Sequence, residues 1–111
     1  MSAGHTVTLS KKVSEQVNGI VLVFSRYTED EPKNYHFNSF FVPRDLVSAQ
    51  LGNGHSFIMT TGNNFDLIAM KYLYIHDDKI VGNENNITTG TGASGITYTN
   101  NAFVLRYVLG V

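Results

Sequence analysis

Short apolar runs separated by polar turns make up most of this 111-residue chain. In several of them apolar and polar side chains alternate, which is the period of a β-strand, and no segment keeps a helical period over three turns. The pattern predicts strands at His5–Leu9, Gly19–Tyr27, Tyr35–Pro43, His55–Thr61, Asp66–Asp77, Ile80–Gly82 and Ala102–Val111. Residues Pro43–Leu51 are the only helix-like stretch, and we expect a short helical turn there.

Three of these strands are apolar on both faces: Ile20–Phe24, Leu67–Ile75 and Phe103–Leu109. A strand of a sandwich normally has one face in water, so each needs a cover on its outer face. That cover is a loop, the short helix or another subunit. The chain is therefore expected to be all-β, an antiparallel, jelly-roll-like β-sandwich with at most one short helical turn. Residues 1–111 form a single module in this interpretation.

The alternation also predicts which side chains share a face. In the fifth strand one face carries Leu67, Ala69, Lys71, Leu73 and Ile75. In the third strand one face carries Tyr35, Phe37, Ser39 and Phe41. The polar, glycine-bearing segment Asn83–Gly95 reads as a loop, and we expect it to be the most mobile part of the chain.

Composition narrows the functional classes. Charged residues make up 15% of the chain, below the usual value of about a quarter, so the surface is covered by Asn, Thr, Ser and Gly. Such a surface suits neutral polar partners, such as sugars or other subunits, but it is also ordinary for all-β domains. The net charge of −1 without a basic stripe argues against nucleic-acid binding. We expect no membrane insertion, no signal peptide and, without cysteine, no thiolate site.

The sequence holds no catalytic motif, so the protein is not expected to be an enzyme, and no cofactor is implied. Most carboxylates lie in or beside predicted turns, where they are common without catalysis. No histidine has the spacing of a metal site, and no metal is expected. The oxygen-rich region Asp77–Asn86 leaves a calcium site open, although it lacks the spacing of an EF-hand loop.

Tyrosine and asparagine suggest a binding surface instead. Sugar sites pair an aromatic ring with the C–H face of the sugar and amides with its hydroxyl groups. The hairpin between the second and third strands carries both residue types, and the candidate carbohydrate-binding residues are Tyr27, Asn34, Tyr35, His36 and Asn38. Each tyrosine can equally be a core or strand-surface residue.

The apolar C-terminal strand is a candidate oligomer interface. We expect it to be central to a sheet or packed against another subunit, with Phe103, Leu105, Tyr107 and Leu109 in the interface. Arg106 should share a face with Val104 and Val108. It could contact an anionic polymer or form an ion pair, or it could pair with a local acid or reach solvent.

Four segments taken together resemble a known group of proteins. "GIVLVFSRY", "NYHFNSFFVP", "KYLYIHDDKIVGN" and "NNAFVLRYVLGV" are similar, in this order, to C-terminal modules of tail-fibre, baseplate and minor structural proteins of bacteriophages and prophages of Gram-positive bacteria. The resemblance covers residues from about Thr6 to Val111, and its most distinctive part is the C-terminal segment.

This resemblance implies an adhesion module at the tail tip of a virion, made in the host cytoplasm. Such modules are commonly homotrimers that recognise host cell-surface polysaccharide or teichoic acid. The resemblance carries over no catalytic residue, and it implies that the chain is part of a longer tail protein. The alternative is a structural module that trimerises or caps a fibre without a ligand of its own.

Overall fold

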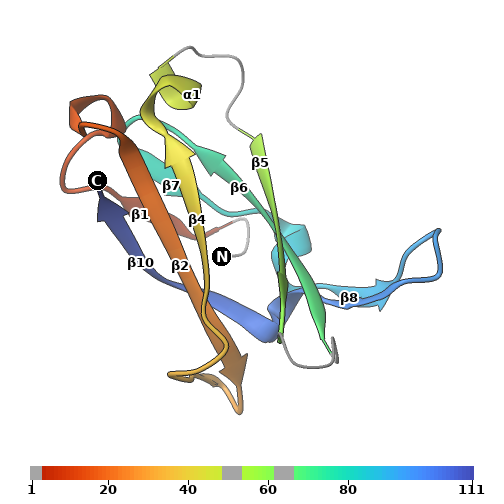
Figure 1. The fold of residues 1–111 in the computed structure, drawn as a ribbon. Coiled ribbons are helices and arrows are strands. Elements are labelled where there is room, and N and C mark those ends of the chain that lie inside the picture. Colours follow the sequence, from red (N-terminus) through yellow and green to blue (C-terminus); the bar gives the residue numbers. More distant parts are fainter. Residues whose placement is uncertain (1–3, 49–53, 62–66) are drawn as a thin grey trace.

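The computed structural model describes residues 4–48, 54–61 and 67–111, and within them the chain folds into antiparallel sheets (Figure 1). Sheet A has the order β1 (Thr6–Thr8), β7 (Lys79–Val81), β6 (Ile68–Ile75) and β5 (Gly54–Thr60). In sheet B, β2 (Gly19–Thr28) lies between β10 (Phe103–Gly110) on one side and β4 (Asn38–Pro43) and β3 (Glu31–Pro32) on the other. Strands β8 (Thr89–Thr91) and β9 (Thr97–Thr99) form a separate hairpin.

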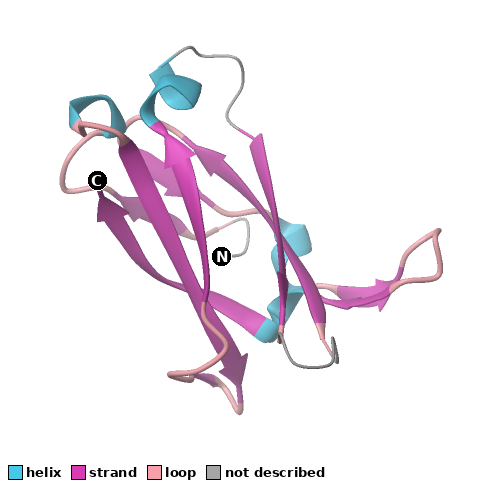
Figure 2. Ribbon diagram, viewed as in Figure 1, coloured by secondary structure: helices cyan, strands magenta, loops and turns pink. Residues whose placement is uncertain are grey.

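The helical elements are short (Figure 2). They are α1 (Arg44–Ser48) and the 3-10 turns η1 (Val13–Glu15), η2 (Glu84–Ile87) and η3 (Asn100–Ala102). The all-β, sandwich-like fold class predicted from the sequence is therefore confirmed. Residues 49–51 of the predicted helical stretch and Asp66 of the predicted fifth strand lie outside the described residues.

The core lies between sheets A and B because alternate residues of their long strands point inward. Sheet B contributes Ile20, Leu22, Phe24, Val42 and Phe103, and sheet A contributes Phe57, Met59, Ala69, Leu73, Ile75 and Ile80. The rings of Phe24, Phe40 and Phe57 meet across the two layers, with the Phe40 and Phe57 centroids 5.0 Å apart. Each large side chain buried here stabilises the fold by roughly 1.5–3 kcal/mol.

Two local predictions differ from the structure. The third strand begins at Asn38 rather than Tyr35, because His36 adopts a φ of 54° that a strand cannot contain. The segment after Asn83 is not an irregular loop, because it contains η2 and the β8–β9 hairpin. That hairpin projects from the body of the sandwich (Figure 1).

The second edge of β6 is completed by side chains rather than by a strand. Strand β7 pairs with β6 only at Tyr74 and Ile75. Beyond that point Asn86 accepts a hydrogen bond from the Tyr72 N–H (2.6 Å) and donates one to the Tyr72 carbonyl (2.9 Å). Asn100 accepts one from the Met70 N–H (2.8 Å). We call these two side chains the asparagine bridge; they satisfy strand groups that are costly to bury unpaired.

Candidate binding site

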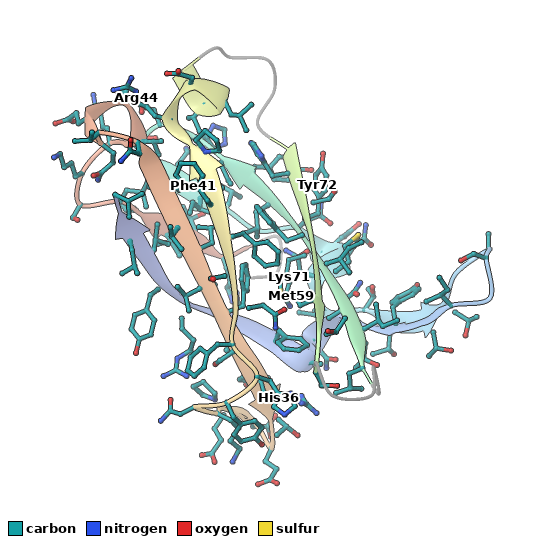
Figure 3. The ribbon with its side chains drawn as sticks, in the orientation of Figure 1. His36, Phe41, Arg44, Met59, Lys71 and Tyr72 are labelled. Carbon is teal, nitrogen blue, oxygen red and sulfur yellow. The ribbon has the colours of Figure 1, made fainter. Side chains whose placement is uncertain are left out.

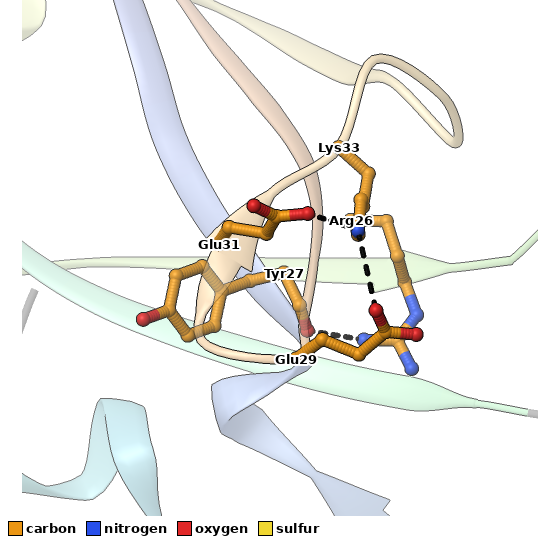
Figure 4. Close-up of polar contacts among 5 residues, drawn as sticks. All are labelled: Arg26, Tyr27, Glu29, Glu31 and Lys33. Carbon is orange, nitrogen blue, oxygen red and sulfur yellow. Dashed lines mark hydrogen bonds and ion pairs between the residues drawn. The ribbon is translucent and has the colours of Figure 1, made fainter.

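The β2–β3 hairpin uses its charged side chains to hold itself together (Figure 4). Lys33 pairs with Glu31 and, at 3.6 Å, with Glu29. The hydrogen bond from Lys33 lowers the pKa of the Glu31 carboxyl group. Arg26 donates to the Tyr27 carbonyl. The charge of Lys33 is thus paired within the hairpin, whereas Arg26 meets a carbonyl group there.

The two asparagines of the predicted sugar site are engaged by the protein. The Oδ1 atom of Asn34 accepts a hydrogen bond from Arg106 (3.1 Å). The Nδ2 atom of Asn38 donates to the carbonyls of His36 (3.3 Å) and Thr60 (3.2 Å), which ties β4 to β5. Asn38 therefore has a structural role that the sequence pattern did not reveal.

The predicted aromatic residues face different surroundings. Tyr27 is half-buried and lines a solvent-open cavity together with Lys71. Tyr35 is 47% exposed, and its ring stands edge-on to the His36 ring at 5.2 Å. The buried Nδ1 atom of His36, labelled in Figure 3, has no hydrogen-bond partner within the described residues. The five residues thus share one end of the molecule but do not form one continuous platform.

A β-bulge at Arg106 reorients the last strand. Leu105 pairs with Phe24 of β2 and Tyr107 with Val23, so Arg106 is the extra residue. The expectation that Arg106 shares a face with Val108 is wrong, because Val108 packs against the core while Arg106 lies on the outer side. Of the two alternatives for the last strand, the central position is wrong, because β10 lies at an edge of sheet B, and packing against another subunit stays a prediction.

The bulge separates the four predicted interface residues. Phe103 is buried, and Leu105 packs against the core. Tyr107 and Leu109 instead point outward, 52% and 49% exposed. The first two therefore stabilise the subunit itself, and only the second two are available to a partner.

An apolar surface, the outer patch, covers the exterior of sheet B. Register places Phe41, Val21 and Leu109 in one row across β4, β2 and β10, with Val23 and Tyr107 in the next row. Phe41, labelled in Figure 3, is 53% exposed. The outer face of β2, predicted to need a cover, is thus only partly covered, since Val21 and Val23 are half-buried.

A second surface feature is a groove along the free edge of β10, which we call the edge groove. It has a volume of about 320 Å³ and lies between β10 and the segment from β1 to η1. Its lining residues are Val7, Thr8, Leu9, Ser10, Lys11, Gln16, Ile20, Leu105, Arg106, Tyr107, Val108 and Gly110.

The edge groove carries positive charge. Lys11 and Arg106 line it, and none of its described lining residues is acidic. Arg106 is fixed by hydrogen bonds to the Ser25 hydroxyl (3.0 Å) and the Lys33 carbonyl (3.2 Å), and its guanidinium lies 5.6 Å from the centre of the Tyr107 ring. The Arg106 side chain is half-exposed. Its hydrogen-bond acceptors within the described residues are all neutral, so no carboxylate there compensates its positive charge. The predicted pairing of Arg106 with a local acid is therefore not seen there.

Sequence reasoning missed this groove. Lys11 and Arg106 are 95 positions apart in the printed sequence, and only the folded chain places both on the walls of one groove. The unusual feature that the sequence did offer was a single arginine within an apolar strand.

The region considered for calcium is occupied by internal contacts. The Asp77 carboxylate accepts hydrogen bonds from the Ser14 N–H (2.7 Å) and hydroxyl (2.8 Å), which lower its pKa. Asn83 accepts from the Asn85 N–H and so caps η2, while Asn86 belongs to the asparagine bridge. Among the described residues, no three His, Cys, Asp or Glu side chains lie close enough together to hold a metal ion.

Comparisons of the chain with protein families, with curated proteins and with solved structures found no match. None of the described helices is long and apolar enough to cross a membrane.

Proposed function

We propose that this chain is a non-catalytic adhesion module that recognises an anionic cell-wall glycan through the edge groove. In this proposal the module lies at the tail tip of a virion, and its ligand is a teichoic acid of a Gram-positive host. The resemblance of the four sequence segments to phage tail proteins supports the location. The groove supports the chemistry of the ligand.

The observation that carries the proposal is the presence of two cations, and no acid, among the described residues that line one groove. Guanidinium and ammonium groups bind phosphate oxygens by charge-assisted hydrogen bonds. The hydroxyl groups of Thr8 and Ser10 and the amide of Gln16 line the same groove and suit the hydroxyl groups of a polyol or sugar. A teichoic acid offers both kinds of group, whereas a neutral polysaccharide leaves the cations unpaired.

The test is calorimetric titration with a polyol-phosphate oligomer purified from a Gram-positive wall. We expect Arg106→Gln to weaken binding by about tenfold or more, because one charge-assisted contact is lost. Lys11→Ala should weaken it less, by about threefold, because Lys11 is exposed. The matched control is Lys12→Ala, since Lys12 is the next residue but does not line the groove.

Salt provides a second readout, because binding through exposed charges weakens as ionic strength rises. Equal loss of binding in the Lys11→Ala and Lys12→Ala variants would indicate general attraction rather than a groove site. Tight binding of a neutral wall polysaccharide, unaffected by Arg106→Gln, would contradict the choice of ligand.

A second candidate function is assembly, and the outer patch favours it. A cluster of half-buried and exposed apolar side chains on one sheet face is typical of surfaces that meet another protein. We propose that three copies associate through this patch. Light scattering behind size exclusion measures the native mass, and a particle of the single-chain mass of 12.3 kDa would contradict trimer formation.

A further inference from the structure

A cavity of about 260 Å³, open to solvent on one side, lies apart from the edge groove and the outer patch. It is lined by His5, Tyr27, Lys71, Ile87, Asn101, Phe103 and Val104. Because His5, Ile87 and Asn101 are exposed, the cavity opens to solvent on their side. Its inner wall contains Lys71 and Phe103, which are each only 2% exposed.

Lys71, labelled in Figure 3, is the one lysine or arginine among the described lining residues of this cavity. It lies on the core-facing side of β6, where its neighbours are Ala69 and Leu73. Its Nζ atom donates to the carbonyls of Asn86 (2.7 Å) and Asn100 (2.5 Å). An ammonium group has three N–H donors, so these two acceptors leave one donor for a further partner.

The surroundings of Lys71 contain cations without counter-ions. Arg26 reaches the same 3-10 turn and donates to the Ala102 carbonyl (3.0 Å). Within the described part of the chain neither Lys71 nor Arg26 has a carboxylate partner. Burying a cation without an anion is costly, and here only carbonyl dipoles offset the charge.

The acceptor carbonyls are held in place before any ligand arrives. The asparagine bridge fixes both residues to the backbone of β6, and Asn100 also donates from Nδ2 to the Asn85 carbonyl (2.9 Å). The amine therefore cannot turn away from the cavity wall without breaking this network. A ligand that enters the cavity meets a preorganised positive charge.

Burial lowers the pKa of Lys71 to about 8, so at neutral pH the amine is still mainly charged. The other titratable or charged groups facing it are His5 and Tyr27 from the lining and Arg26 from β2. Among the residues that the structure describes, the lining contains no acid that would already neutralise the lysine.

We propose that this cavity binds a small carboxylate with a short apolar body. The carboxylate supplies the missing anion to Lys71, and Ile87, Phe103 and Val104 supply apolar contacts for the body. The volume lies just below the range of about 300–1,000 Å³ typical of drug-sized ligands, so the ligand is smaller than those. This site is independent of the glycan groove, and either can be absent without affecting the other.

The test compares benzoate with benzamide, which has a similar shape but no charge. Protein labelled with ¹³C at the lysine ε-carbons reports the Lys71 signal directly by NMR. We expect benzoate to shift that signal and to raise its titration midpoint, and benzamide to bind at least about tenfold more weakly because it lacks the charge. Benzoate binding should fall as the pH rises through the pKa of Lys71.

Two variants locate the site. Lys71→Met should abolish the preference for benzoate over benzamide. Because that variant could also fail to fold, Val104→Trp fills the cavity from β10 and keeps the lysine. It should lose benzoate binding while its Lys71 signal still titrates. Equal binding of both probes, binding of neither, or full benzoate binding by Val104→Trp would overturn the proposal.

Discussion

Two strand edges of this molecule are treated in opposite ways. On β6, the edge left by the short β7 is closed by the amides of Asn86 and Asn100. On β10, the outer edge has no strand neighbour in the described part of the chain and faces an open groove. An open edge is a site where another chain or ligand can pair. The comparison separates a part of the protein that serves stability from a part that is free to serve recognition.

The largest expected effect is a loss of stability when a residue that closes the β6 edge is replaced. Asn86→Ala removes both partners of the Tyr72 backbone and leaves two partly buried groups unsatisfied, so it should lower the free energy of unfolding by about 2–3 kcal/mol. Asn85→Ala is the control, because the Asn85 side chain is exposed in the same turn, and it should change stability by less than about 0.5 kcal/mol. Urea denaturation measures both. Similar losses in the two variants would show that the turn, rather than the bridge, matters.

The next largest expected effect is the pH dependence of stability caused by Lys71, which lies beside the closed edge. Lys71 has a pKa of about 8 in the folded protein and an ordinary value of 10.5 when unfolded. Below pH 8 both states are charged, and the burial penalty is present in full. As pH rises from about 8 to 10.5 only the native state releases the proton, so stability should increase, by up to about 3 kcal/mol for this group.

The measurement is the difference in unfolding free energy between the native sequence and Lys71→Met across this pH window. Other lysines and tyrosines titrate in both proteins and largely cancel. If Lys71→Met does not fold, the NMR titration of the Lys71 ε-carbon gives the pKa directly. A titration midpoint near 10.5 would contradict the buried, uncompensated state.

The smallest expected effect on stability lies beside the open edge. Leu109→Lys places a charge at an exposed position of the outer patch, so the unfolding free energy of the isolated subunit should change by less than about 0.5 kcal/mol. If the patch joins subunits, the same change should shift the native mass toward the monomer. An unchanged oligomer would mean that another surface holds it together.

Features set by local sequence were predictable, and features set by pairing between distant segments were not. The strands β2, β6 and β10 follow from local apolar runs, and the inward face of β6 with Lys71 on it follows from alternation. Lysine among apolar inward positions was a visible signal of a buried amine. The edge groove and the asparagine bridge depend on contacts between distant segments, and asparagine in a polar segment normally indicates a solvated turn.

Single backbone conformations account for the remaining differences. The bulge at Arg106 moves Tyr107 and Leu109 to the outer face, and the alternation of residue types along β10 does not mark it. The positive φ of His36 ends the predicted third strand early, although histidine at that conformation is uncommon. The sequence therefore predicted one continuous surface for the candidate sugar-binding residues, and the structure separates them.

The projecting β8–β9 hairpin has a practical consequence for engineering. Its exposed tip, Gly92–Gly95, closes with backbone hydrogen bonds, and its two ends are anchored to β6 through Asn86 and Asn100. Exposed tips of this kind tolerate inserted sequence because no core contact depends on them. A foreign peptide placed between Ala93 and Ser94 would be displayed away from the sandwich, which makes this small domain a scaffold for presenting epitopes.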